Sequence, residues 1–209
     1  MPRKVLTAAD LEGVLAGVEF TIAAGTLITP LAREEAARRN IILRVAEPET
    51  GQGQSGARRV VAIAADHGGF ELKEELRGHL RDWGYTVLDF GTDSTAAVDY
   101  PDFAEAVAGA LARGEAWRGV VIDTAGIGSA IAANKVPGVR AALCYDRTTA
   151  RNSREHNDAN LLSLGARMIP SELAREILAI WLETPFAGGR HQRRVDKIRA
   201  IEARFLRPG

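Results

Sequence analysis

The chain has 209 residues, of which 46% are hydrophobic and 26% are charged, as in an ordinary soluble domain with or without a short extension. Its 27 basic residues balance its 27 acidic residues, so no overall charge attracts nucleic acid or an anionic membrane surface. No stretch approaches the roughly 18 apolar residues of a membrane span, and the N-terminus lacks the pattern of a secretory signal. We therefore expect a cytoplasmic protein.

The N-terminal part of the chain is set apart by a linker. Residues 8–45 predict a short helix, an extended hairpin-like segment, a helix from about Pro30 to Arg39, and a strand. The run "EPETGQGQSGARR", Glu47 to Arg59, has almost no apolar residues and is rich in Gly and Gln, as flexible linkers are. We predict an N-terminal extension with its linker at residues 1–57 and a main domain at residues 58–209.

Strands and helices alternate after the linker. The run "RRVVAIAAD" predicts a buried strand, and apolar residues at near-helical spacing follow it until Gly84. Four more strands are predicted at "YTVLDFG", "RGVVIDT", "VRAALCY" and "NLLSLGA", with helices between them, and two amphipathic helices, 171–183 and 189–205, close the chain. This alternation predicts a doubly wound, Rossmann-like α/β/α fold around a parallel sheet. The chain has one cysteine, which excludes a disulfide framework and a cysteine-based metal site. This residue, Cys144, is expected to be a buried core thiol.

Polar residues gather next to the predicted strands, where open α/β sheets bind ligands. The residues concerned are Asp66 and His67 after the first strand, Asp99 and Tyr100 after the second, Asp123 after the third, Tyr145 and Asp146 after the fourth, and His156 and Asn157 before the fifth. Each aspartate alone is more often a turn or N-cap residue. Their coincidence is what predicts a ligand site.

Two further segments could bind an anion. The stretch "VVIDTAGIGSAIAANKV" runs a strand into a glycine turn, but its spacing is not G-x-G-x-x-G, which argues against a nicotinamide cofactor. This turn either binds an anion through its N–H groups or only packs a helix on the strand. The segment "GGRHQRRVDKI" places Arg190, Arg193 and Arg194 with His191 at the start of a helix. These arginines form either a solvated basic face or a phosphate clamp.

The stretch from about Val60 to Glu202 resembles the type B ribose-5-phosphate isomerases and the related galactose-6-phosphate isomerase subunits. The resemblance rests on "AADHGGFELKEEL", "DYPDFA", "GIGSAIAANKVPGVRAAL", "REHNDANLLSLGARMI" and "GGRHQRRVDKI", in the family's order. It implies isomerisation of ribose 5-phosphate and ribulose 5-phosphate, or of a related pentose or hexose phosphate, through an enediolate. It also implies no cofactor and no metal, and a homodimer or dimer of dimers with shared active sites.

The same resemblance implies roles for individual residues. Opening of the sugar ring needs a proton shuttle such as His67 or His156. Asp66 and His67 would face the sugar, and Tyr100 would line it. His156 and Asn157 would assist ring opening or bind hydroxyls, and Arg190 and Arg194 would hold the phosphate. The enediolate oxygen would accept hydrogen bonds from the turn made of Gly126, Ile127, Gly128 and Ser129.

The sequence departs from the family at the catalytic base. The family usually has a cysteine at the position of Asp123 or a glutamate at the position of Ser129, and neither is present. Ala125 replaces a hydroxyl residue, and Thr124 offers a hydroxyl that is expected to point to the other side of the turn. Asp123 is then the candidate base, because a partly buried carboxylate can abstract a proton. The alternative is a sugar-phosphate protein with altered chemistry or with binding only.

The N-terminal segment "GTLITPLAREEAARR" looks like a segment of several enzymes associated with bacterial microcompartments. This likeness implies an interaction or targeting module that binds a microcompartment shell or cargo partner, and a location inside such a compartment. The alternative is an added piece that covers surface or stabilises a dimer.

Overall fold

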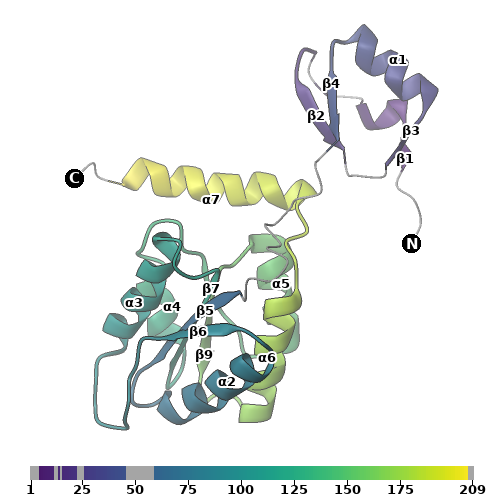
Figure 1. Cartoon of the computed structure of the whole chain (residues 1–209). Helices are drawn as coiled ribbons and strands as arrows, with labels where there is room; N and C mark the ends of the chain where they lie inside the picture. Colours follow the sequence, from purple (N-terminus) through teal and green to yellow (C-terminus); the bar gives the residue numbers. More distant parts are fainter. Residues whose placement is uncertain (1–4, 12–13, 15, 23–25, 46–58, 207–209) are drawn as a thin grey trace. The chain divides into compact units, whose positions relative to one another are not determined.

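The computed structural model describes residues 5–11, 14, 16–22, 26–45 and 59–206. The chain divides into two compact units, Met1–Ala57 and Arg58–Gly209 (Figure 1). The predicted linker lies outside the described residues, apart from Arg59. Each unit is described by itself.

The first unit pairs its short strands in parallel. Strand β1 (Val5–Leu6) pairs with β3 (Leu27–Ile28), and β2 (Glu19–Ile22) pairs with β4 (Ile42–Val45). The expectation of a hairpin-like segment is therefore wrong. The physical reason is that helix α1 (Pro30–Arg38) lies between β3 and β4 and returns the chain so that β4 runs in the same direction as β2.

Helix α1 begins as its sequence predicts. The Thr29 hydroxyl accepts a hydrogen bond from the Ala32 amide at 3.2 Å, and Pro30 takes the first helical position, where its missing N–H costs nothing. A 3₁₀ turn, η1 (Ala8–Leu11), lies against α1. The core of this unit is small and includes Leu6, Leu11, Ile22, Ala32, Ala36 and Ile41.

The second unit is a five-stranded parallel sheet in the order β6-β5-β7-β9-β8. Its strands are β5 (Val60–Ala65), β6 (Thr86–Asp89), β7 (Arg118–Asp123), β8 (Ala141–Leu143) and β9 (Leu161–Gly165). The central strands are apolar along their whole length because both faces of the sheet are covered. The doubly wound α/β/α prediction is confirmed.

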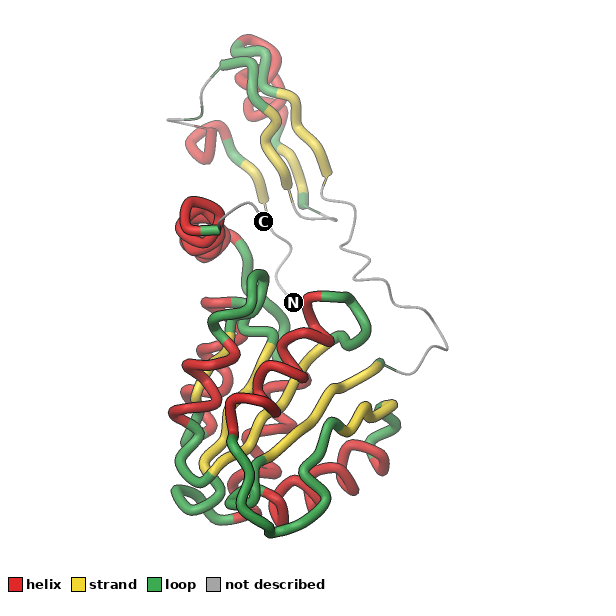
Figure 2. The backbone as a smooth tube through the Cα atoms, turned by 90° about the vertical axis from the view of Figure 1, so that its left-hand side faces the viewer, coloured by secondary structure: helices red, strands yellow, loops and turns green. Residues whose placement is uncertain are grey.

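Helices cover both faces of this sheet (Figure 2). Helices α2 (Phe70–Asp82), α5 (Arg147–Asn157) and α6 (Ser171–Glu183) pack into one apolar cluster, which contains Leu76, Ile177 and Trp181. Helices α3 (Tyr100–Ala112) and α4 (Ile127–Ala133) pack into the cluster on the other face, which contains Val107 and Val121. Each connection between two strands that are consecutive in the sequence therefore contains a helix, as parallel pairing requires.

The C-terminal helix starts later than predicted. The expected helix 189–205 is a 3₁₀ turn, η2 (Gly189–His191), followed by α7 (Gln192–Phe205). Gly188 and Gly189 both have positive φ, so the chain changes direction before α7 begins. Arg190 and His191 belong to the turn, and Arg193 and Arg194 belong to the first turn of α7.

Candidate active site

The order of the strands places a crevice beside β5. The chain passes from β5 to β6 on one side and later to β7 on the other side, so the topology switches between β5 and β7. The Asp66 amide donates to the Ile122 carbonyl at 3.1 Å, which brings the C-terminal ends of these two strands together. Open α/β sheets bind their ligands at such a switch point.

A pocket of about 430 Å³ opens at this edge of the sheet. Its lining includes His67 and Gly68 after β5, and Ala166 and Arg167 after β9. Thr95 also lines it, so the loop from Thr92 to Val98 contributes to the pocket. His67 Nδ1 lies 3.2 Å from the Val98 carbonyl oxygen and 3.3 Å from the Val98 amide nitrogen, which fixes the ring against this loop.

Arg167 is a pocket residue that the sequence prediction did not name. It follows β9 directly, and its amide donates to the Thr124 carbonyl at 3.1 Å. The signal for it was present, because "NLLSLGAR" places a cation just after an apolar strand. The pocket therefore holds an imidazole and a guanidinium, groups that can bind an anionic ligand, together with the carboxylates of Glu71 and Glu75.

Asp123 is fully engaged in hydrogen bonds. Its Oδ1 accepts from the Ala125 amide at 2.7 Å and from the Gly126 amide, and its Oδ2 accepts from the Ser129 amide at 3.0 Å and the Ser129 hydroxyl at 2.5 Å. The residue is 5% exposed. A carboxylate has about four acceptor positions, and all of them are taken. The assignment of Asp123 as the base stays a prediction, and this hydrogen bonding counts against it.

Asp66 is held differently. Its Oδ1 accepts from the amides of Gly68 at 2.8 Å and Gly69 at 3.0 Å. Its Oδ2 accepts a hydrogen bond from none of the described residues. Among those residues, His191 Nδ1 is the one fully buried side-chain polar atom without a partner, so Asp66 Oδ2 is not a buried orphan atom. One oxygen of Asp66 is therefore fixed by the backbone and the other has no donor among these residues.

The turn after β7 brings Thr124 and Tyr100 to the same region. A Cβ added at Gly68 would lie 2.2 Å from the Thr124 hydroxyl and 3.3 Å from Asp66 Oδ1, so this hydroxyl points toward the end of β5. A Cβ added at Gly128 would lie 2.5 Å from the Tyr100 ring, so Tyr100 packs on the first turn of α4. Glycine is needed at both positions for these close approaches.

The amides of residues 126–129 differ in whether they already donate a hydrogen bond. Those of Gly126 and Ser129 donate to Asp123 and are not available to a ligand in this arrangement. Those of Ile127 and Gly128 find no acceptor within the described part of the chain. The expected enediolate site over residues 126–129 is therefore reduced to the two middle amides.

The other predicted site residues lie at the opposite edge of the sheet. Helix α5 starts after the C-terminal end of β8 and runs back for 11 residues, about 16 Å, to His156 and Asn157. The next strand, β9, begins a few residues later, which places both residues at the N-terminal edge. Within one chain the structure thus brings together Asp66, His67, Tyr100 and Asp123. The second set of predicted site residues lies apart from them and contains His156, Asn157, Arg190 and Arg194.

This second group is built around two stacked imidazoles. The rings of His156 and His191 are parallel within 5°, with centroids 4.0 Å apart. Arg190 Nε lies 3.3 Å from His191 Nε2, and Asn152 Nδ2 lies 2.8 Å from His156 Nδ1. Burial and the neighbouring His156 lower the pKa of His191 below its usual value. Arg190 and Arg194 are exposed and pair with no acidic side chain of the described residues.

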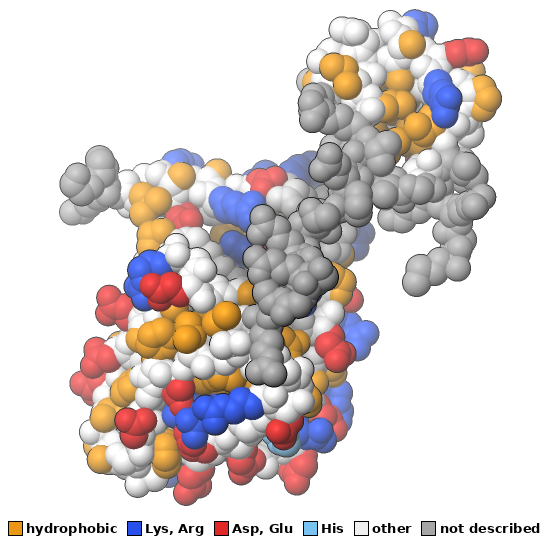
Figure 3. Space-filling model, in the orientation of Figure 1, with side chains coloured by type: hydrophobic (Ala, Val, Ile, Leu, Met, Phe, Trp, Pro, Cys, Tyr) orange, Lys and Arg blue, Asp and Glu red, His pale blue; other side chains and the backbone are white. Residues whose placement is uncertain are grey.

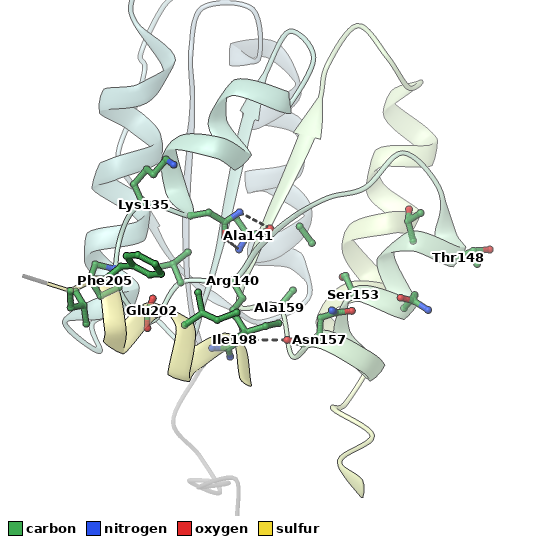
Figure 4. Close-up of a pocket in the computed structure, with 18 residues that line it drawn as sticks. Lys135, Arg140, Ala141, Thr148, Ser153, Asn157, Ala159, Ile198, Glu202 and Phe205 are labelled. Carbon is green, nitrogen blue, oxygen red and sulfur yellow. Dashed lines mark hydrogen bonds between the residues drawn. The ribbon is translucent and has the colours of Figure 1, made fainter. Parts of the chain in front are cut away.

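A larger apolar groove of about 840 Å³ lies beside this second group (Figure 4). It runs along the edge strand β8 and α5, and its other wall is α7 with Ile198, Ile201 and Phe205. The Gly138 amide donates to Glu202 Oε1 at 2.9 Å and ties α7 to the loop before β8. Phe205 is 79% exposed, which is unusual for an aromatic residue on a groove wall.

The remaining surface and core features agree with the composition. Acidic and basic side chains are interspersed on the face of the second unit that Figure 3 shows. Cys144 is buried as expected, and burial raises the pKa of its thiol to about 11. The described residues contain no His, Cys, Asp and Glu cluster that could hold a metal ion. None of their helices is long and apolar enough to cross a membrane.

With this sheet and this pocket, the chain belongs to the ribose/galactose isomerase family, whose model matches residues 61–198. A putative sugar phosphate isomerase of Bacillus subtilis is 47% identical over 147 residues, which cover 70% of this chain and 99% of the relative. The ribose-5-phosphate isomerase B of Escherichia coli is 46% identical over 69% of this chain and 97% of its own. The structure of the Clostridium thermocellum ribose-5-phosphate isomerase B aligns with a TM-score of 0.70 at 51% identity, covering 70% of this chain and 99% of that one.

Proposed function

We propose that the chain interconverts an aldose phosphate and its ketose phosphate. The observation that carries this proposal is the pocket after the C-terminal ends of β5 and β9, which His67 and Arg167 line and which Asp66 adjoins through Gly68. Family membership favours this function over binding alone. Relatives include a ribose-5-phosphate isomerase B and a D-erythrulose-4-phosphate isomerase, so the choice of sugar differs within the family.

Each group of the pocket supports one step of such a reaction. An imidazole such as His67 can pass a proton to the ring oxygen near neutral pH and open the sugar. Arg167 offers a cation for the phosphate. The amides of Ile127 and Gly128 can donate to an enediolate oxygen. No step of this sequence requires a redox cofactor or a metal.

We expect the protein to exchange deuterium from solvent into C1 or C2 of its substrate. The enediolate step removes a carbon-bound proton, which can be replaced from solvent before it returns. The measurement is mass spectrometry or NMR of pentose and hexose phosphates incubated with the full chain in deuterated water, with the dephosphorylated sugars as the matched control. Tight binding of a sugar phosphate without any exchange would favour the binding-only alternative.

We further propose that the active site is shared between two copies of the chain. Two observations support this. The phosphate-binding candidates Arg190 and Arg194 lie at the opposite edge of the sheet from His67, so one chain cannot bring them together. The apolar groove beside them is lined by exposed Ile198, Ile201 and Phe205, and a second copy would cover it. A two-fold axis would then place the N-terminal edge of one copy against the pocket of the other.

Subunit complementation tests the shared site. One variant carries His67→Ala, and the other carries Arg190→Met with Arg194→Met. Each alone is expected to be nearly inactive. In a hybrid dimer one active site contains both sets of substitutions and the other site contains neither. Random mixing makes about half of the dimers hybrids, and each hybrid keeps one of its two sites, so about a quarter of wild-type activity should return. Recovery of none after verified hybrid formation would contradict a site built from two copies.

The role of residues 1–57 stays a prediction. The family match begins at residue 61, and the first unit has a core of its own. We propose that this unit is an interaction module, and a microcompartment shell or cargo protein is the partner its sequence suggests. The cytoplasm, or the inside of such a compartment, is the location we propose.

A further inference from the structure

We propose that Asp66, and not Asp123, is the carboxylate that moves the proton between C1 and C2 of the sugar. This inference rests on the proposed isomerase function. It concerns the base, because this sequence has neither a cysteine at position 123 nor a glutamate at position 129.

The first argument is the occupancy of Asp123. Four donors fill its two oxygens, and three of them are backbone amides that cannot rotate away. To accept a proton from a substrate carbon, Asp123 would have to give up one of these hydrogen bonds and leave either a backbone amide or the buried Ser129 hydroxyl unpaired. An unpaired buried donor costs about 1–3 kcal/mol. The carboxylate of Asp123 therefore holds the turn that begins α4.

The second argument is the geometry of Asp66. Two backbone amides fix Oδ1 and so orient the carboxylate, while Oδ2 has no donor among the described residues. The side chain is the first after β5, next to the pocket residues His67 and Gly68. The residue is 6% exposed, almost the same as Asp123, so the difference between the two lies in their hydrogen bonds and not in their burial.

The third argument is the position of Thr124. Its hydroxyl lies next to Gly68, near the C-terminal end of β5. The Thr124 hydroxyl and Asp66 Oδ1 therefore both lie next to Gly68, a residue that lines the pocket. Thr124 would position the sugar there by a hydrogen bond.

The proton transfer balances without any further reactant. Asp66 Oδ2 takes the proton from C2 of the open-chain aldose, the C–H electron pair forms the C1=C2 bond, and the carbonyl electrons move to O1. The carboxylic acid then returns a proton to C1. The hydroxyl proton on O2 is lost and a proton is gained on O1, which leaves the ketose carbonyl at C2 and the carboxylate of Asp66 as it began.

The test compares amide variants of the two carboxylates in the full chain. Asp66→Asn should lower kcat and deuterium exchange by about 10²- to 10⁴-fold, while the affinity for the sugar phosphate changes by less than about tenfold. Asp123→Asn should lower the unfolding temperature, because the NH₂ of the new amide would face backbone N–H donors. The Asp123→Asn protein that remains folded should exchange deuterium into the sugar much faster than Asp66→Asn does. Asp82→Asn, at the exposed end of α2, is the matched control and should change neither.

Rescue by a small carboxylate distinguishes a proton acceptor from a structural group. Formate is expected to restore part of the exchange to folded Asp66→Gly and none to Asp123→Gly. The inference is overturned if folded Asp123→Asn loses exchange while Asp66→Asn keeps it. If the wild-type protein exchanges label with no sugar phosphate, the proposed function fails at that earlier point, before any variant is compared.

Discussion

We expect the double substitution Arg190→Met with Arg194→Met to lower kcat/KM for a phosphorylated sugar by about 10²- to 10⁴-fold. Hydrogen bonds to charged groups contribute about 1.5–3 kcal/mol each, and two such contacts to one phosphate would be lost. The two arginines lie close together in the chain, Arg190 in the turn η2 and Arg194 in the first turn of α7. Both are exposed and neither is held by an acidic partner of the described residues.

The matched control for this pair removes the same charge elsewhere. Arg81→Met with Arg175→Met takes two exposed arginines from α2 and α6, and should leave kcat/KM within about twofold, because long-range charge effects are screened at physiological salt. Steady-state kinetics with the phosphorylated sugar and calorimetry with its dephosphorylated form complete the comparison. An equal loss of affinity for both ligands would mean that the arginines do not recognise phosphate.

The second large effect is expected on stability, from Trp181→Ala. Trp181 is fully buried in the cluster under α6, and its indole N–H donates to the Ser153 hydroxyl at 3.2 Å. Its ring also faces the buried Arg118 guanidinium at 4.9 Å. Replacing a buried tryptophan by alanine costs about 3–5 kcal/mol, out of a total of about 5–15 kcal/mol for a typical domain.

Thermal or denaturant unfolding followed by tryptophan fluorescence measures this loss. The remaining tryptophans, Trp83 and Trp117, also lie in the second unit and report on its unfolding. The unfolding temperature should fall by about 6–20 °C. Trp181→Phe keeps most of the packing and loses the hydrogen bond to Ser153, so its cost should be about 1–2 kcal/mol. Equal losses for Ala and Phe would mean that the hydrogen bond, and not the packing, stabilises this cluster.

The sheet of the second unit could be predicted because its signal is local. Each central strand is a short apolar run that is buried on both faces, and each helix carries its own periodic pattern. The pairing of the first unit could not be predicted in this way. Its strands are two to four residues long, and which of them pair depends on where α1 returns the chain.

The site could be predicted in its residues but only partly in its arrangement. Asp66 and His67 follow a strand and Asp123 ends one, and the rule for open sheets places them together. His156 and Asn157 precede a strand, and strand direction alone already assigns them to the other edge. The hydrogen bonds of Asp123 could not be read from the sequence, because they depend on the path of the turn back over the carboxylate.

The parallel pairing in the first unit also affects the order in which the chain can fold during translation. Strands β2 and β4 cannot pair until synthesis has passed Val45, so the unit completes its pairing only when nearly all of it has been made. Strand β5, the first of the second unit, starts at Val60. At about 5–20 residues per second the ribosome adds the intervening residues within a few seconds. The nascent N-terminal unit can therefore complete its own sheets before the larger sheet has received its second strand.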